Sequence, residues 1–112
     1  VALSGGEAQR IKLLRTLCNE NTDKKKIYIL DEPTTGLSLY DIEKLLTLLE
    51  SIIERGNTIV VSEHNLEFLS ACDYIIELGP GGGCNGGKII AEGSPKMLKE
   101  SVDSIIGEYL LV

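Results

Sequence analysis

The chain has 112 residues, of which 43% are hydrophobic and 25% are charged, and its formal net charge is −6 at pH 7. This length suits one small domain or a piece of one, and the composition excludes a disordered or fibrous chain. No apolar run approaches the ~20 residues that a membrane-spanning helix needs, so we expect a cytoplasmic protein with no membrane partner. The negative net charge argues against binding of nucleic acid through the overall charge of this chain.

The first predicted helix begins at Ser4, where the spacing Ser-x-x-Glu forms a capping box with Glu7. A polar turn over 19–26 then precedes the apolar run 27–30, which is typical of a buried parallel strand. The buried face of the helix is predicted from apolar residues at helical spacing, namely Ala8, Ile11, Leu14, Leu17 and Cys18.

The second predicted helix runs from about Leu39 to Arg55, and Gly56 supplies its left-handed cap. A β-branched strand is predicted over 58–62, a short helix over 65–71 and a strand over 74–78. The core face of the second helix is predicted to carry Ile42, Leu45, Leu46, Leu49, Ile52 and Ile53.

Six glycines and a proline over 79–87 predict a loop, and 88–92 is predicted to return as the second strand of a terminal β-hairpin. Ser94 and Pro95 predict the start of a short helix that ends near Glu100. Residues 101–112 carry no decisive pattern, and a docked helix is one alternative. Strands alternating with helices predict an α/β fold with a mostly parallel sheet flanked by helices.

The three cysteines are widely spaced and form no Cys-x-x-Cys pair, which argues against a zinc site within the chain. Cys18 and Cys72 fall on apolar helical positions, so we expect reduced thiols that fill the core. Cys84 lies in the glycine-rich loop and is predicted to be exposed. Because a functional motif follows Val1 almost at once, we expect the chain to be a carboxyl-terminal portion of a longer protein.

The start of the first helix is a candidate phosphate site. Its free amides and dipole favour an anion, and Gly5 and Gly6 beside Ser4 allow a terminal phosphate to come close. The alternative is that Ser4 and Glu7 only cap the helix.

The acidic pair Asp31 and Glu32 follows the first predicted strand, at the edge where open α/β sheets bind ligands. Two adjacent acids are costly there unless they are used. Asp31 is predicted to hold a magnesium ion through water, and Glu32 to orient or deprotonate the attacking water in phosphate-anhydride hydrolysis. The alternative is a turn that merely closes the strand, with Pro33 preventing its continuation as a helix.

His64 stands 32 residues after Glu32, at the end of the next β-branched run. Parallel pairing would place it beside the acids, where it could hydrogen-bond a terminal phosphate and report its loss. A lone histidine is otherwise typical of an ordinary surface or core position. The turn over 35–38 links the acidic pair to the second helix, and Ser38 with Asp41 can also cap that helix.

These motifs together resemble those of ATP-binding-cassette (ABC) ATPases. Residues 3–7 resemble the LSGGE motif, 27–32 the Walker B strand with its catalytic glutamate, 35–38 the D-loop, and His64 the switch histidine. The resemblance implies the carboxyl-terminal lobe of a P-loop NTPase fold that uses ATP and Mg²⁺. It assigns catalysis to Glu32 and His64, metal binding to Asp31, and nucleotide binding to Ser4, Gly5, Gly6, Glu7, Asp31, Gly36, Leu37 and Ser38.

Longer strings, over 3–13, 31–37, 63–66 and 78–87, resemble the second ATPase module of the UvrA family of nucleotide excision repair. This resemblance covers about residues 2–100. Ser38 replaces the family's usual histidine, and the loop over 81–87 lacks its usual acidic residues, so a divergent paralogue stays an alternative.

The resemblance implies two ATPase modules of one chain that pack head to tail. Residues 4–7 would complete the partner module's site, while Asp31, Glu32 and His64 serve their own. A homodimer, zinc binding and contact with damaged DNA are expected for the full-length protein, and none of its zinc cysteines lies in this segment.

No G-x-x-x-x-G-K-S/T loop occurs in the 112 residues, so the main phosphate cradle, the Walker A loop, is missing. We therefore expect 1–112 to be a fragment of one nucleotide-binding domain that is inactive without the missing N-terminal part of its module. Two alternatives stay open. One is the head lobe of an SMC-type ATPase, which separates the same motifs by a coiled coil, and the other is a non-catalytic interaction module.

Overall fold

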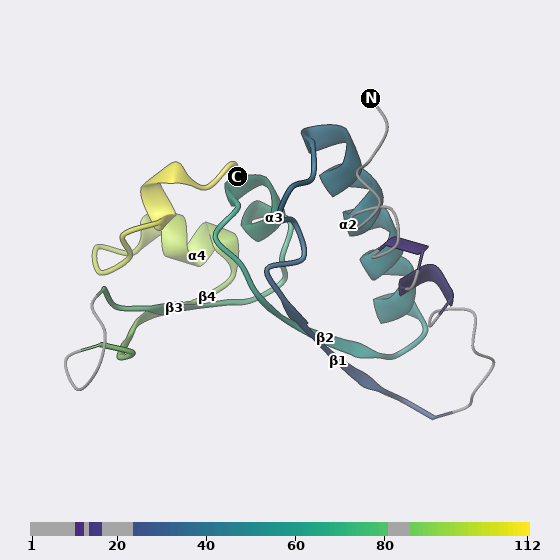
Figure 1. Ribbon diagram of the computed structural model, residues 1–112. Helices are drawn as coiled ribbons and strands as arrows, with labels where there is room; N and C mark the ends of the chain where they lie inside the picture. Colours follow the sequence, from purple (N-terminus) through teal and green to yellow (C-terminus); the bar gives the residue numbers. More distant parts are fainter. Residues whose placement is uncertain (1–10, 13, 17–23, 81–85) are drawn as a thin grey trace. The chain divides into compact units, whose positions relative to one another are not determined.

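The computed structural model describes residues 11–12, 14–16, 24–80 and 86–112 (Figure 1). The predicted LSGGE motif at 3–7 lies outside the described residues, as do Cys18 and Cys84. Residues 11–12 and 14–16 are helical, and the side chains of Ile11 and Leu14 are buried, which confirms that part of the first predicted helix. The chain divides into two compact units, Val1–Glu63 and His64–Val112, which are taken in turn.

The first unit contains a pair of parallel strands, β1 (Ile27–Asp31) and β2 (Thr58–Ser62). A parallel pair needs a crossover connection, and helix α2 (Leu39–Glu54) supplies it, lying along one side of the pair (Figure 1). The register pairs Ile27 with Thr58 and continues to Asp31 opposite Ser62. The predicted parallel α/β arrangement is confirmed for these two strands.

Burial alternates along β1, so the expectation of a fully buried strand is wrong for this chain. Tyr28 and Leu30 are half-buried, whereas Ile27 and Ile29 are 70% and 79% exposed. Successive side chains of a strand point to opposite faces of the sheet. In the described part of the chain, α2 covers one face, and the other face keeps its apolar side chains in the open.

Helix α2 begins at Ser38 with the predicted reciprocal cap. The Asp41 amide donates to Ser38 Oγ at 3.3 Å, and that hydroxyl donates to Asp41 Oδ2 at 2.8 Å. After the helix, Gly56 takes the predicted left-handed conformation, with φ of 91°. The predicted core face of α2 is confirmed at four buried positions, Ile42, Leu45, Leu49 and Ile52. Leu46 is half-buried. The prediction is wrong at Ile53, which is 36% exposed at the border of the apolar stripe.

Asn57 ties the end of α2 to the start of β1. Its Nδ2 donates to the carbonyl of Ile52 at 2.9 Å, and its Oδ1 accepts a bond of 2.9 Å from the amide of Lys26. This side chain thereby helps to align the two parallel strands at their amino-terminal ends.

The second unit contains the short helix α3 (Leu66–Ser70) and an antiparallel hairpin of β3 (Ile75–Leu78) and β4 (Ile89–Gly93). The predicted hairpin is confirmed. Among the described strands, however, β3 pairs with β4 in a separate two-stranded sheet, so the mostly parallel sheet is not observed. The two strands of this sheet run antiparallel, with Ile75 opposite Gly93.

Helix α4 (Pro95–Glu100) starts as predicted, because Ser94 Oγ accepts a bond of 3.2 Å from the Met97 amide and proline occupies the first turn. Near the hairpin, Tyr74 Oη donates to Glu92 Oε1 at 2.6 Å, and this bond raises the pKa of Tyr74 above 10.0. A bond to Glu108 likewise raises the pKa of Tyr109.

The carboxyl-terminal residues dock onto this unit through a 3₁₀ turn, η2 (Gly107–Tyr109), and not through a regular helix. Leu110 is 1% exposed and packs in a core cluster with Ile75 and Leu98. Cys72 is half-buried against this cluster, and its thiol donates to the carbonyl of Phe68 at 3.4 Å, which confirms its predicted packing role. None of the helices that the structure describes has the length and apolar character of a membrane span.

Buried Glu77 attaches the carboxyl-terminal segment to β3. Its Oε1 accepts a bond of 2.5 Å from Ser104 Oγ, and its Oε2 accepts bonds of 2.9 and 3.2 Å from the amides of Ile105 and Ile106. Gly107 follows directly, where an added Cβ would lie 2.0 Å from the carbonyl oxygen of Leu98. A buried carboxylate with three donors and a close backbone approach together fix the path of this segment.

Candidate functional site

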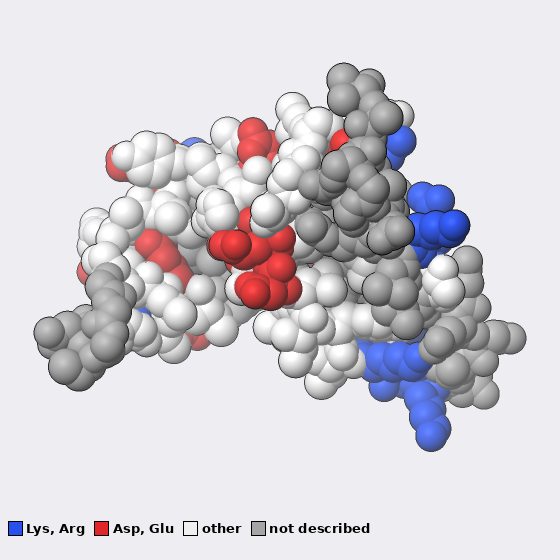
Figure 2. Space-filling view, viewed as in Figure 1, with Lys and Arg blue, Asp and Glu red and all other residues white. Residues whose placement is uncertain are grey.

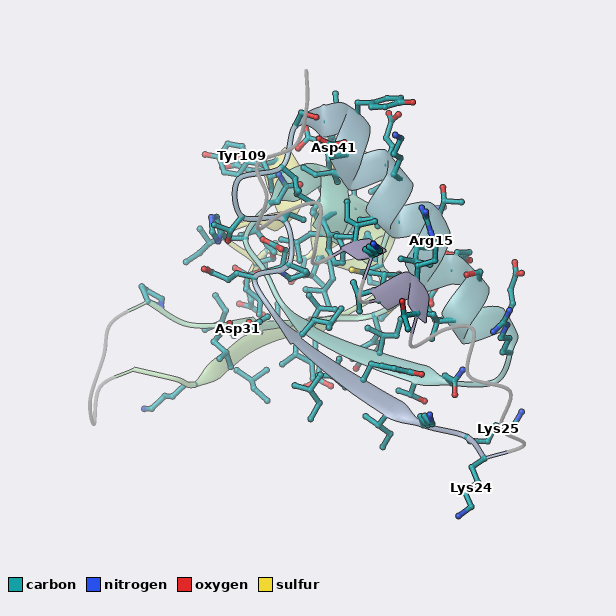
Figure 3. All side chains as sticks on the ribbon, turned by 45° about the vertical axis from the view of Figure 1, so that its right-hand side comes forward. Arg15, Lys24, Lys25, Asp31, Asp41 and Tyr109 are labelled. Atoms are coloured by element: carbon teal, nitrogen blue, oxygen red, sulfur yellow. The ribbon has the colours of Figure 1, made fainter. Side chains whose placement is uncertain are left out.

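The candidate site lies where β1 and β2 end. The parallel register places Asp31 directly opposite Ser62, and Figure 3 labels Asp31 at this end of the strand, whereas Lys24 and Lys25 lie before its beginning. The side chains of Asp31 and Ser62 are both exposed, and Ser62 Oγ donates a hydrogen bond to Asp31 Oδ1. One oxygen of the predicted metal-binding carboxylate is thus held by the neighbouring strand.

Glu32 occupies an unusual backbone conformation. Its φ of 45° is in the left-handed region, and among the described residues it is the one non-glycine residue with positive φ. Such a conformation costs about 1–2 kcal/mol for a residue with a side chain. It persists because the Glu32 amide donates to Ser62 at two points, to the carbonyl oxygen at 2.8 Å and to Oγ at 3.3 Å.

Thr35 donates two hydrogen bonds to the carbonyl group of Glu32. Its amide donates to the carbonyl oxygen of Glu32 at 3.2 Å and its Oγ1 donates to the same atom at 2.9 Å. Glu32 is therefore hydrogen-bonded through both its backbone groups, while its side chain is exposed. The fold thus fixes the position from which this side chain leaves the backbone.

The turn that follows leads directly into α2. The Leu37 amide donates to the carbonyl of Thr34 at 3.0 Å, and Gly36 takes a positive φ of 78°. The Thr34 amide, at a position only 8% exposed, donates to Glu63 Oε2 at 3.2 Å. This bond connects the turn after β1 to the end of β2, so both strand ends shape one site.

The first unit brings five of the predicted site residues onto this one connection, namely Asp31, Glu32, Gly36, Leu37 and Ser38. The predicted phosphate-binding residues 4–7 lie outside the described residues. His64 is the first residue of the second unit, two positions after β2. Its approach to the acidic pair stays a prediction.

A metal ion at this edge would depend on a bound nucleotide. Among the described residues, no group of three or more His, Cys, Asp or Glu side chains could hold a metal ion by itself. Mg²⁺ does not require such a group, because it keeps several waters and uses one or two carboxylates with phosphate oxygens. A single exposed carboxylate at Asp31, already oriented by a hydroxyl, fits that donor set.

The charge of this region supports the same conclusion. Figure 2 shows Lys and Arg side chains where β1 begins in Figure 1, whereas the acidic pair Asp31 and Glu32 follows at the other end of this strand. Adjacent carboxylates repel a polyphosphate, so a divalent cation is needed to bring phosphate and acids together.

The sequence reasoning missed the contributions of Ser62 and the Glu63 carboxylate. A signal was available, because the predicted strand over 27–30 is followed at once by Asp31 and the predicted strand over 58–62 ends in Ser62. Aligning them in parallel from their first residues places Ser62 beside Asp31. The contact of Glu63 with the Thr34 amide depends on the turn conformation and leaves no such signal.

Comparisons with known proteins agree on one group. The chain is 52% identical over 108 residues to UvrABC system protein A of Mycoplasmopsis pulmonis and 54% identical over 109 residues to that of Mycoplasma genitalium, each match covering 96% of this chain. The chain spans only 11% of the length of these relatives. No family model matches it.

A solved structure gives the same result. The crystal structure of UvrA2 from Deinococcus radiodurans matches with a TM-score of 0.77 and 40% identity, covering 96% of this chain and 13% of that one. The sequence and structural matches each cover 96% of this chain, and they fall on UvrABC system protein A and on UvrA2. The chain is therefore UvrA-like, and it is similar over nearly its whole length to one segment of UvrABC system protein A.

Proposed function

We propose that residues 1–112 form the carboxyl-terminal fragment of one ABC-type nucleotide-binding domain, in a UvrA-like DNA damage recognition protein of nucleotide excision repair. The full-length protein would be an ATPase that uses ATP and Mg²⁺. The observation that carries the proposal is the acidic pair at the end of β1, where Glu32 is held in a left-handed conformation with its carboxylate exposed. The similarity to UvrABC system protein A supports the choice of family.

Each acid has a separate role in this proposal. Asp31 would hold Mg²⁺ through a water ligand, and the ion, when bound, neutralises charge on the phosphates. The Glu32 carboxylate would orient and deprotonate the attacking water. Backbone bonds on both sides of Glu32 restrict the position of its Cα, which favours one geometry for the water.

The remaining motif residues would contact nucleotide or respond to it. His64 would hydrogen-bond the terminal phosphate. Residues 4–7 would bind the nucleotide held by the partner module, together with the turn over 36–38, whose first residue has a positive φ of 78°. The missing N-terminal part of the module would supply the phosphate loop, so we expect the fragment alone to be inactive.

The full-length protein would have further partners. We expect a second ATPase module in the same chain, a homodimer, damaged DNA and a cytoplasmic location. Zinc, which the resemblance implies for the full-length protein, would be held outside this segment. A repair protein and a divergent paralogue both accommodate the other expectations, and the response to damaged DNA separates them.

The proposal is tested by ATP turnover of the full-length parent protein, with and without damaged duplex DNA, beside the same assay on the fragment. Turnover that responds to damage, with none from the fragment, supports a repair ATPase. Turnover that ignores DNA favours a paralogue with another partner.

Two variants of the parent test the catalytic assignment. Glu32→Gln should abolish turnover while ATP stays bound, because the amide cannot accept the proton of the water. Asp31→Asn should weaken metal-dependent nucleotide binding. A parent that turns over ATP equally well with either substitution would refute the ATPase assignment at this site and favour a non-catalytic interaction module.

A further inference from the structure

The Ser62 hydroxyl contacts both residues of the acidic pair. It donates its single proton to Asp31 Oδ1, and its oxygen accepts a bond of 3.3 Å from the Glu32 amide. The carbonyl oxygen of Ser62 accepts the same amide at 2.8 Å. One residue of β2 thus holds the carboxylate of Asp31 and the strained backbone of Glu32 at the same time.

We propose that Ser62 is a positioning residue for nucleotide hydrolysis: its hydroxyl fixes the carboxylate plane of Asp31 for the hydrated metal ion and stabilises the Glu32 conformation from which the general base acts. This inference rests on the proposed function. It adds a residue that the motifs do not assign, because Ser62 stands outside the Walker B segment and before the switch histidine.

The carboxylate of Asp31 needs such a restraint. It is exposed at the last position of β1, where an unrestrained side chain samples several rotamers. A metal ligand that is already oriented loses less conformational freedom when the ion binds. The Ser62 bond restricts one carboxylate oxygen and thereby favours a single orientation of the other.

The backbone of Glu32 needs a restraint for a different reason. Its positive φ is unfavourable for a residue with a Cβ. The bond to the Ser62 carbonyl belongs to the strand geometry and survives any substitution, whereas the bond to Oγ depends on the side chain. Removing the hydroxyl would therefore weaken the restraint without removing the strand pairing.

The neighbouring Glu63 does not share this position. Its Oε2 accepts the Thr34 amide at 3.2 Å and so supports the turn beyond the acidic pair. The hydroxyl of Ser62 is the side-chain group of β2 that bonds directly to Asp31 in the described part of the chain.

The sharpest test compares Ser62→Thr with Ser62→Val in the full-length parent. Threonine and valine have nearly the same shape and both suit an exposed strand position, but only threonine keeps the hydroxyl. Ser62→Ala is a second variant without the hydroxyl and without the added methyl groups. Ser51→Ala is the matched control, because Ser51 lies on α2 and its Oγ donates to the Leu48 carbonyl at 2.6 Å, away from the acidic pair.

Two measurements on each variant separate positioning from folding. The first is the Mn²⁺ concentration at half-saturation of the parent with a non-hydrolysable ATP analogue, followed by electron paramagnetic resonance. The second is kcat and KM for ATP at saturating Mg²⁺. Thermal unfolding of each variant shows whether the fold is kept.

Losing one hydrogen bond to a charged group predicts a roughly tenfold rise in the half-saturating Mn²⁺ concentration and a roughly tenfold fall in kcat for the valine and alanine variants. The KM for ATP should stay within about twofold, because the hydroxyl is assigned no contact with the nucleotide. Threonine should restore both values to within about twofold of the parent, and Ser51→Ala should leave them unchanged.

Equal values for the valine and threonine variants, whether both normal or both impaired, would overturn the inference, because the hydroxyl would then have no specific effect. Asp31→Asn keeps this failure distinct from a failure of the proposed function. If Asp31→Asn abolishes turnover while Ser62→Val leaves both kcat and the half-saturating Mn²⁺ concentration unchanged, only the role of Ser62 is refuted. If neither substitution matters, the catalytic role of the acidic pair is refuted, and the role of Ser62 with it.

Discussion

One buried carboxylate, that of Glu77, accepts three of the hydrogen bonds that attach the carboxyl-terminal segment. Replacing Glu77 by alanine would remove the carboxylate that accepts three hydrogen bonds. These come from Ser104 Oγ at 2.5 Å and from the amides of Ile105 and Ile106 at 2.9 and 3.2 Å. Leaving a buried donor unsatisfied costs about 1–3 kcal/mol. The side chain of Ile105 is 54% exposed, so water can reach part of this segment and the three losses will not add fully.

We therefore expect Glu77→Ala to lower the free energy of unfolding by about 2–4 kcal/mol, a large fraction of the ~5–15 kcal/mol of an ordinary domain. Glu77→Gln should cost only about 1 kcal/mol, because its amide oxygen can accept the two backbone donors and the loss is mainly that of charge. Ser104 Oγ can then accept from the glutamine amide, as it already accepts the Gly107 amide at 2.8 Å.

Urea denaturation of the chain, followed by far-ultraviolet circular dichroism, measures these differences. Hydrogen exchange at the Ile105 and Ile106 amides localises the effect, since both amides donate to Glu77. Faster exchange at these two positions in the alanine variant is expected. An alanine variant within about 0.5 kcal/mol of the wild type, or a glutamine variant as unstable as alanine, would refute the reasoning, because neither fits loss of bonds to a buried carboxylate.

Three further predictions follow from other contacts. Gly107→Ala should lower the melting temperature, because the new Cβ would lie 2.0 Å from the Leu98 carbonyl oxygen and the backbone must move; an unchanged melting temperature would contradict that close packing. Ser38→Ala removes the side-chain cap of α2 and should cost about 1 kcal/mol in urea denaturation, whereas Ser38→Asp should retain most of the stability. The bond from Tyr74 to Glu92 raises the pKa of Tyr74. The contribution of this bond to stability is therefore complete below the unfolded pKa of 10.0 and is lost as pH rises through the higher folded value. Tyr74→Phe should reduce this alkaline loss of stability in melting curves taken at stepwise pH, and an identical pH dependence in the variant would count against the bond.

Much of the local structure was predictable from short-range patterns. Ser38 followed by an acid three residues later indicated the start of α2, and Gly56 indicated its end, because caps depend on residues within one turn. Ser94 and Pro95 indicated the start of α4 for the same reason. The acidic pair could be placed at a strand end because a β-branched run and a proline bound it.

Contacts between distant residues could not be predicted in this way. The continuous apolar run over 27–30 does not reveal which face of β1 a helix covers, and the exposed position of Ile29 follows only from the placement of α2. The antiparallel pairing of β3 depends on which strand lies beside its edge. Neither the spacing of apolar residues nor the strand propensity of each residue carries this information.

By itself, the sequence determined the order of helices and strands, the caps of α2 and α4, and the candidate acids Asp31 and Glu32, because these depend on neighbours along the chain. Only the tertiary structure decided that Ser62 holds both acids, through a register joining residues 31 positions apart. It likewise decided that Glu77 binds the carboxyl-terminal segment, across 27 to 29 positions. The physical reason is the same in both cases, since a side-chain hydrogen bond is set by where packing brings its two atoms and not by their separation in the chain.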